Sequence, residues 1–212
     1  MPRPETDIEA GREKLIQIAE AIIRERGAIN FTITDLAAEA GMSQSNVYRF
    51  FENKDALAEA MAGRWFAELI TIIEKLVEED IPVEHKLYEF FARRLIIKRS
   101  RFEEDPDLFR SYMELGRQHF EVVRGYVDLT DHYMAIILAE AMEEGYFEGL
   151  ELDKVVSLVN TMVQPFCNPN LMVNMMHLAD EDRLRQVIDT ILNGLKAREQ
   201  EPLKKATLYI AS

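Results

Sequence analysis

The residues with the clearest chemical potential lie between positions 32 and 54, where side chains suited to contact DNA follow one another closely. In a helix that begins near Gln44, each residue advances by about 100°, so Ser45 and Arg49 point almost directly away from the apolar Val47. Arginine can bond bidentately to guanine and glutamine to adenine, whereas serine is less selective. Hydroxyl groups, lysine and helix N-termini suit phosphate contact. The candidate DNA-contacting residues are Thr32, Thr34, Ser43, Gln44, Ser45, Asn46, Tyr48, Arg49 and Lys54.

These side chains need a rigid support, and the sequence around them meets the steric requirements of a helix-turn-helix with helices at about 33–40 and 44–51. Ala37 would let the two helices approach closely, and Gly41 would make the turn with a positive φ without strain. Val47 would lock the second helix onto the first. The remaining members of this small core are expected to be Leu36, Met42 and Phe50. The same pattern also occurs in ordinary helical hairpins, so simple packing is the alternative interpretation.

A longer run around this motif, from Phe31 to Leu57, closely resembles the TetR family of bacterial transcriptional regulators. Its sequence Val-Tyr-x-Phe-Phe-x-Asn-Lys-x-x-Leu is far more specific than a bare helix-turn-helix. With the helix expected before it, the resemblance covers about residues 8–57. It implies a homodimer in which each subunit has a three-helix DNA-binding head and a larger helical domain that binds a small effector and dimerises. The implied partners are therefore a double-stranded DNA operator, nearly palindromic because of the dimer axis, and a small-molecule effector.

By position, the resemblance also implies a role for six of these residues. Gln44, Ser45 and Arg49 would read bases, Thr34 would make an auxiliary contact, and Tyr48 and Lys54 would contact phosphates. The sequence departs from a typical head in its charge. Residues 1–60 hold 7 Lys+Arg and 11 Asp+Glu, a net charge of −4, whereas DNA-binding domains are usually basic. We therefore expect each head to neutralise few phosphates and its binding to depend only weakly on salt.

In the rest of the chain, apolar residues recur at three- and four-residue steps, and no segment alternates as a strand does. The expected fold is all-α, with about nine helices. Capping residues, Gly and Pro predict helices at about 8–26, 33–40, 44–51, 54–80 and 83–102, two more between 106 and 145, and then 152–163 and 180–198. The expected domains are a helix-turn-helix DNA-binding domain at 1–53, a helical effector-binding and dimerisation domain at 54–198, and a C-terminal tail at 199–212.

The larger domain is rich in aromatic residues, most of which are expected in its core. The family resemblance places an effector pocket between the middle helices, and such a pocket needs an apolar cleft with a few polar groups. The candidate polar groups are Tyr112, His119, Tyr126 and His132. For the two histidines, a surface or hydrogen-bonded position is the alternative.

One basic run stands out in this acidic chain, formed by Arg93, Arg94, Lys98, Arg99 and Arg101. It could form an anion site for an acidic effector. Alternatively, it could complement the dipole at a helix C-terminus and pair with the acidic residues that follow it, which is the interpretation we favour from sequence.

Two segments, 155–163 and 187–195, carry apolar stripes wide enough to require a partner. These helices are candidates for a four-helix dimer interface. On pattern alone, packing within one subunit explains the stripes equally well, and the resemblance favours the dimer.

Composition excludes several classes of protein. Among 212 residues, the net charge of −13 argues against unspecific coating of nucleic acid. A single cysteine, Cys167, allows no internal disulfide, and no stretch is long enough to span a bilayer, so a cytoplasmic location without membrane contact is expected. No metal-ligand spacing, cofactor motif or catalytic constellation stands out, so we expect no metal, no cofactor and no enzymatic activity. The alternatives to a ligand-responsive repressor are a helical adaptor that has lost DNA binding and an enzyme.

Overall fold

The computed structural model describes residues 5–26 and 31–195, and within these ranges every regular element is an α-helix, which confirms the expected all-α fold. The expected tail at 199–212 lies outside the described residues. The helices are α1 (Glu5–Arg26), α2 (Ile33–Glu39), α3 (Gln44–Val47), α4 (Lys54–Glu78), α5 (Val83–Glu104), α6 (Pro106–Gln118), α7 (Phe120–Glu143), α8 (Leu152–Met162), α9 (Gln164–Cys167), α10 (Pro169–Asn174) and α11 (Glu181–Gly194).

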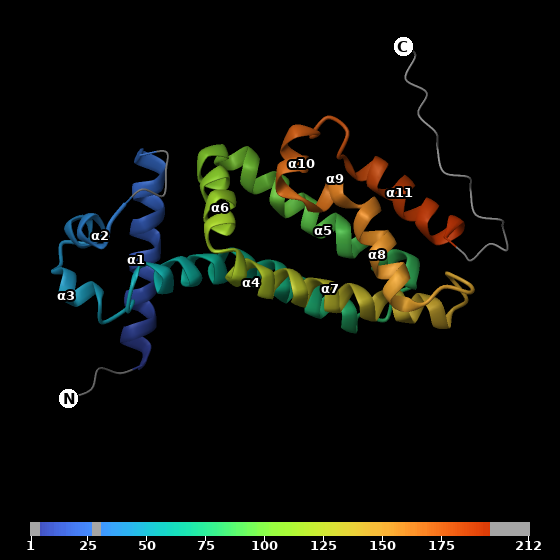
Figure 1. The fold of residues 1–212 in the computed structure, drawn as a ribbon, viewed down its shortest axis with the longest axis horizontal. Helices are drawn as coiled ribbons and strands as arrows, with labels where there is room; N and C mark the ends of the chain where they lie inside the picture. Colours follow the sequence, from blue (N-terminus) through green and yellow to red (C-terminus); the bar gives the residue numbers. More distant parts are fainter. Residues whose placement is uncertain (1–4, 27–30, 196–212) are drawn as a thin grey trace, which may run out of the picture.

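The head consists of α1, α2 and α3, and Figure 1 shows α1 standing across one end of the long α4. Its core confirms the helix-turn-helix prediction, because Ala37 and Val47 are buried and Gly41 has a φ of 64°. Phe31 and Phe51 are the fully buried phenylalanines of this core, whereas Phe50 is half-buried. The Phe50 ring lies so close to Gly11 of α1 that a Cβ atom there would collide with it.

The second helix of the motif is shorter than the expected 44–51, because α3 ends at Val47. The amides of Arg49 and Phe50 bond to the carbonyl oxygens of Asn46 and Val47, three residues back, at 3.3 and 2.9 Å. The chain thus tightens into 3₁₀-type turns, as helix ends often do. The Arg12 guanidinium donates to the Phe50 carbonyl oxygen at 2.7 Å and holds this end of the motif against α1.

The larger domain is built around three long helices, with α4 and α7 lying side by side along the molecule and α5 packed on both (Figure 1). Its core includes Phe90, Phe91, Ile137 and Leu138, all almost fully buried. The helices α8 and α11 add the inner part of their apolar stripes to the same core, namely Val155, Val159, Val163, Ile188, Ile191 and Leu192. Much of each stripe therefore packs within the subunit, while Met162 stays 41% exposed on the outer side.

Helix α6 joins the two parts of the molecule. Its residues Leu108, Tyr112 and Leu115 belong to the core of the head, together with residues of α1 and the first turns of α4. Its neighbouring residue Phe109 belongs to the core of the larger domain. Trp65 of α4 packs against both cores. The head and the larger domain are therefore continuous in packing, and α6 contributes to both.

Candidate DNA-binding surface and effector cavity

The first part of the candidate DNA surface is the start of α2. Thr32 caps this helix, since its Oγ1 accepts from the Asp35 amide at 3.2 Å while an Asp35 oxygen accepts from the Thr32 amide at 2.7 Å. The Thr32 hydroxyl also donates to the Asp35 carboxylate at 2.7 Å, and this bond, together with the bond from the Thr32 amide and a contribution from Arg26, lowers the pKa of Asp35 to about 2. Thr32 remains exposed beside this reciprocal cap, which fixes the direction in which α2 begins.

The turn between α2 and α3 gathers four more of the candidates. The Gln44 amide donates to Thr34 Oγ1 at 2.6 Å, and the Ser43 and Ser45 hydroxyls lie 3.1 Å apart. All four side chains are exposed. The two helices of the motif are therefore linked on their solvent side by groups that can exchange these bonds for bonds to DNA.

The remaining candidates lie at the end of the motif, where Tyr48 and Arg49 are exposed and Asn46 is half-buried. Within the described residues, the Arg49 side chain has no hydrogen bond or ion pair, so its guanidinium is available for a base edge. Lys54 opens α4 and lies over the Phe31 ring, with its Nζ 5.4 Å from the ring centroid. The structure thus gathers all nine candidates at the motif and the start of α4, at one end of the molecule (Figure 1).

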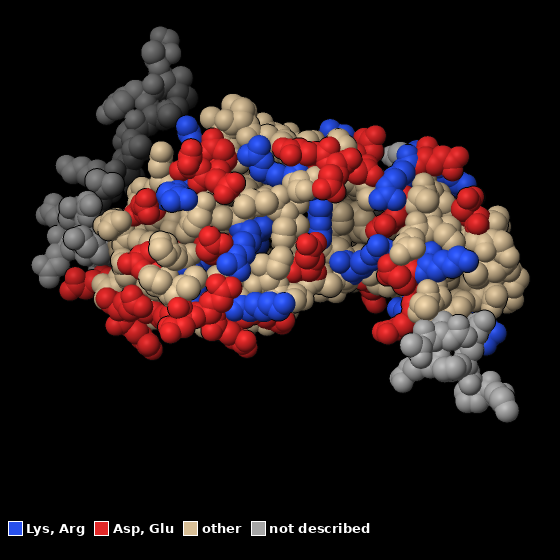
Figure 2. Space-filling model, turned by 180° about the vertical axis from the view of Figure 1, so that it is seen from behind, with Lys and Arg blue, Asp and Glu red and all other residues tan. Residues whose placement is uncertain are grey.

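Several basic side chains of the head are already bound to protein groups. Arg12 donates to the Phe50 carbonyl, Arg24 pairs with Asp105 at 2.7 Å, and Arg26 pairs with Asp35 at 3.2 Å. Figure 2 shows blue basic side chains lying among red acidic ones over the face it presents. The structure thus gives a physical reason for the weak salt dependence expected from the sequence.

An apolar cavity of about 370 Å³ lies in the larger domain, between α4, α5, α6, α7 and the α9–α10 turn. Its size is in the range of small-molecule sites. Its apolar lining includes Trp65, Phe66, Leu69, Phe109, Met113 and Val123. This cavity is the candidate effector site.

Of the four pocket residues expected from sequence, only Tyr112 is among those that line the cavity. His119 caps the junction of α6 and α7, with its Nδ1 3.6 Å from an Asp55 oxygen. The Tyr126 ring stacks on Phe66 at 4.8 Å, behind the cavity wall, and His132 is exposed on α7. The structure does not bring these four side chains together.

Two basic residues of α5, Arg94 and Lys98, line the cavity and were not among the expected pocket groups. Lys98 is buried, and its Nζ donates to the carbonyl oxygens of Phe166 and Cys167 at 3.1 and 2.7 Å. Burial lowers the pKa of Lys98 to about 8, and the nearby charge of Arg94 adds to this shift. The spacing of four residues in the basic run was the available signal, since it puts both side chains on one helix face.

The rest of the basic run is paired elsewhere. Arg93 pairs with Glu79 and Glu89. Arg99 pairs with Glu103 and donates to the Ala179 carbonyl oxygen. Arg101 pairs with Glu68 and donates to the Trp65 carbonyl oxygen. The interpretation favoured from sequence, pairing with acidic residues, therefore describes these three residues, although only Glu103 comes from the acidic segment that follows. It does not describe Arg94 and Lys98.

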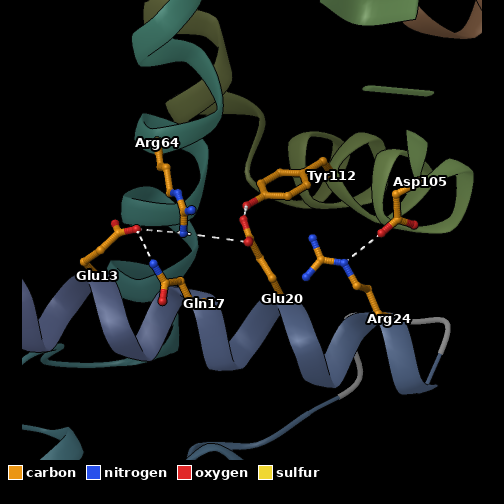
Figure 3. A network of polar contacts seen from close by, with 7 residues as sticks. All are labelled: Glu13, Gln17, Glu20, Arg24, Arg64, Asp105 and Tyr112. Atoms are coloured by element: carbon orange, nitrogen blue, oxygen red, sulfur yellow. Dashed lines mark hydrogen bonds and ion pairs between the residues drawn. The ribbon is translucent and has the colours of Figure 1, made fainter. Parts of the chain in front are cut away.

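A polar network connects the cavity wall to the head (Figure 3). The Tyr112 hydroxyl points toward α1 and donates to Glu20 of that helix at 2.5 Å. Burial and this hydrogen bond raise the pKa of the Tyr112 phenol, which therefore remains a donor. Arg64 of α4 lies 3.7 Å from Glu20 and 3.1 Å from Glu13.

A second link between α1 and the start of α6 is the pair formed by Arg24 and Asp105 (Figure 3). Asp105 also accepts from the Leu108 amide at 2.9 Å and so caps α6. This cap, with a smaller contribution from Arg24, lowers the pKa of the Asp105 carboxyl. Helix α6 and its N-cap are therefore bonded to α1 at two points.

Two features are absent from the described part of the chain. No group of three or more His, Cys, Asp or Glu side chains there is arranged to hold a metal ion. No described helix combines the length and apolar character needed to cross a membrane.

Comparisons with known proteins give a consistent result. The family model described as "Bacterial regulatory proteins, tetR family" matches residues 15–61, and the one described as "Tetracyclin repressor-like, C-terminal domain" matches residues 83–188. An HTH-type transcriptional regulator from the dhlA 5' region of Xanthobacter autotrophicus is 27% identical over 162 residues, which cover 74% of this chain and 76% of the relative. The fatty acid metabolism regulator protein of Bacillus subtilis is 24% identical over 149 residues, covering 66% and 75%.

Among solved structures, the fold is similar to that of SmeT, the repressor of the Stenotrophomonas maltophilia multidrug efflux pump SmeDEF. The TM-score is 0.65 at 23% identity, and the match covers 92% of this chain and 98% of SmeT. At this identity the likeness concerns the fold.

Proposed function

This chain belongs to the TetR family of bacterial transcriptional regulators, and from that premise we propose that it is a repressor whose dimer leaves a palindromic operator when an effector fills the cavity. Members of this family bind operator DNA and small-molecule effectors and act as dimers. The observation that carries the proposal is the position of Tyr112, which lines the cavity with its ring and bonds to the head with its hydroxyl.

In this proposal the exposed side chains of α3 enter the major groove. Arg49 and Gln44 contact base edges, and Ser45 adds a less selective contact. Tyr48, Lys54 and the hydroxyls at the start of α2 hold phosphates and fix the position of the head. Gln44 gives up its bond to Thr34 on binding, so its contribution is a difference between two hydrogen bonds rather than a whole one.

Release requires that the effector binds better to a conformation with altered head positions than to the operator-bound one, because only a difference in affinity shifts the population. The cavity wall offers a route for that difference. A ligand that occupies the space beside Trp65 and Phe109 displaces α6, which also contributes Leu108, Tyr112 and Leu115 to the core of the head. The head then has to follow α6.

We also propose that the protein acts by binding alone, on DNA in the cytoplasm. The relatives are regulators, and a transcriptional regulator acts where its DNA is. The cavity supports this view, since its buried polar side chains are engaged in structural bonds, such as those of Lys98 to two carbonyl oxygens.

The test is fluorescence-anisotropy binding of the full-length protein to duplex DNA from its own upstream region, with scrambled duplex as the control. We expect sequence-dependent binding that saturates at one dimer per site. Arg49→Ala should weaken it by roughly 1–3 kcal/mol and relax the sequence preference at one base. The matched control is Arg124→Ala, which removes an exposed arginine of α7 outside the motif and should leave binding unchanged. Equal binding of specific and scrambled DNA by the parent, for duplexes that tile the whole upstream region, would contradict the proposal.

A further inference from the structure

The charge of the cavity wall is opposite to the charge of the protein. The chain carries 38 Asp+Glu against 25 Lys+Arg, yet no residue that lines the cavity is acidic. Three lining residues are basic, namely Arg94, Lys98 and Arg117. Arg117 is neutralised by Glu114, whose two carboxylate oxygens accept from it at 2.9 and 2.6 Å. Arg94 and Lys98 have no such partner.

Lys98 is buried with only neutral partners. Its Nζ contacts two backbone carbonyl oxygens, which satisfy two of the three ammonium donors and leave its charge uncompensated. Arg94, one helical turn earlier on the same face of α5, lies over the Phe90 ring with its Cζ 5.1 Å from the centroid. Within the described residues it has no hydrogen bond or ion pair. Two adjacent cations without a counter-charge are unfavourable in an apolar site, and an anion between them removes that penalty.

We infer that the effector is an apolar small molecule with a carboxylate, whose head group lies between Arg94 and Lys98 and whose body fills the space lined by Trp65, Phe66 and Met113. The inference rests on the proposed function, because it takes this cavity as the effector site. The Arg94 guanidinium supplies the geometry for a two-point bond to a carboxylate, and Lys98 supplies its remaining donor. The aromatic and aliphatic wall selects the body by burial.

The protein contains its own probe for this test. Trp65 is the single tryptophan of the chain, lines the cavity, and stacks on Tyr112 with the ring centroids 4.2 Å apart. A ligand that enters the cavity changes its surroundings, so tryptophan fluorescence reports binding without any DNA. Titration at pH 7 with decanoate, decanol and decylamine compares three molecules with the same apolar body and different head groups.

We expect decanoate to bind at least about tenfold more tightly than decanol, and decylamine to bind most weakly, since a bond to a charged group contributes more than a factor of ten. Arg94→Gln should reduce decanoate affinity by about tenfold and leave decanol affinity unchanged. Lys98→Met should likewise reduce decanoate affinity. If Lys98→Met does not fold because Lys98 is buried, Arg94→Gln still tests the inference. Arg124→Gln is the matched control, because it removes an exposed arginine of α7 that does not line the cavity.

Two outcomes would overturn the inference. One is decanol or decylamine binding as tightly as decanoate, and the other is no fluorescence response to any of the three probes. Neither outcome decides the proposed function, which is tested separately by the binding of operator DNA. If operator binding is sequence-dependent and a neutral probe releases the DNA, the regulator stands and only the carboxylate is wrong.

Discussion

The change Tyr112→Phe tests the link between cavity and head with the loss of a single oxygen atom. The phenylalanine ring can keep its stack on Trp65 and its place in the cavity wall, whereas the hydrogen bond to Glu20 disappears. The Glu20 side chain is only 12% exposed and keeps Arg64 at 3.7 Å, which is beyond hydrogen-bonding distance. A mostly buried carboxylate therefore loses its only hydrogen-bond donor among the described side chains.

The magnitude follows from the chemistry of this bond. A hydrogen bond to a charged group contributes about 1.5–3 kcal/mol to the free energy of unfolding, and we take ~2 kcal/mol here. For a chain of this length the melting temperature should fall by roughly 4–8 °C. If the effector also breaks this bond, the same ~2 kcal/mol, or about 30-fold, belongs to the coupling between effector and operator.

The assay is operator binding by fluorescence anisotropy, with and without saturating effector. Because the variant has already lost the bond, we expect it to bind operator more weakly than the parent without effector and to respond less when effector is added. The matched control is Tyr133→Phe. It removes a hydroxyl of α7 that donates to Glu74 of α4 at 2.8 Å, far from the head. It should change neither quantity, at a protein concentration held fixed.

A parent-like operator affinity and a parent-like response to effector in Tyr112→Phe would refute this reasoning. A large loss of thermal stability with unchanged coupling would mean that the hydrogen bond holds the fold together but carries no signal.

Three further predictions rest on single residues. Gly41→Ala should lower the melting temperature by about 2–4 °C because Gly41 has a φ of 64°, whereas Gly125→Ala, in a helix with open space around it, should raise it. Lys98 has a pKa of about 8 in the folded chain and 10.5 as its ordinary value, so between these pH values the unfolded chain binds more protons than the folded one. The free energy of unfolding should therefore rise with pH in that window. Denaturant titrations should show this rise in the parent and not in Lys98→Met. Lys54→Ala should weaken binding to all DNA sequences alike and reduce the slope of log affinity against log salt by about one, measured by anisotropy at several salt concentrations.

The head could be predicted from sequence because its constraints are local. Ala37, Gly41 and Val47 are separated by few residues, and each meets a steric requirement that depends only on its neighbours in the motif. The length of α3 could not be predicted in the same way. It ends early where the Phe50 carbonyl bonds to Arg12, which is 38 residues away in the sequence.

The cavity was harder to predict because its wall comes from helices far apart in the sequence. The rotation of α7 directs Tyr126 and His132 away from the cavity, and His119 lies at the junction of α6 and α7, beside Asp55. The basic run of α5 contained the missing information in its spacing. A helix distributes consecutive side chains around its axis, so one run can send Arg93 to surface acids and Arg94 into a cavity.

The same geometry explains why α6 is suited to transmit a signal. Phe109 and Met113 line the cavity, and their neighbours Leu108 and Tyr112 lie about 100° further round the helix, in the core of the head. A helix turns or shifts as a unit because its backbone hydrogen bonds hold it together, so a ligand that displaces one face displaces the other by a similar amount. Close packing prevents the head core from absorbing that displacement, and α1 has to move. Coupling between cavity and DNA surface therefore needs one rigid helix rather than a long chain of contacts.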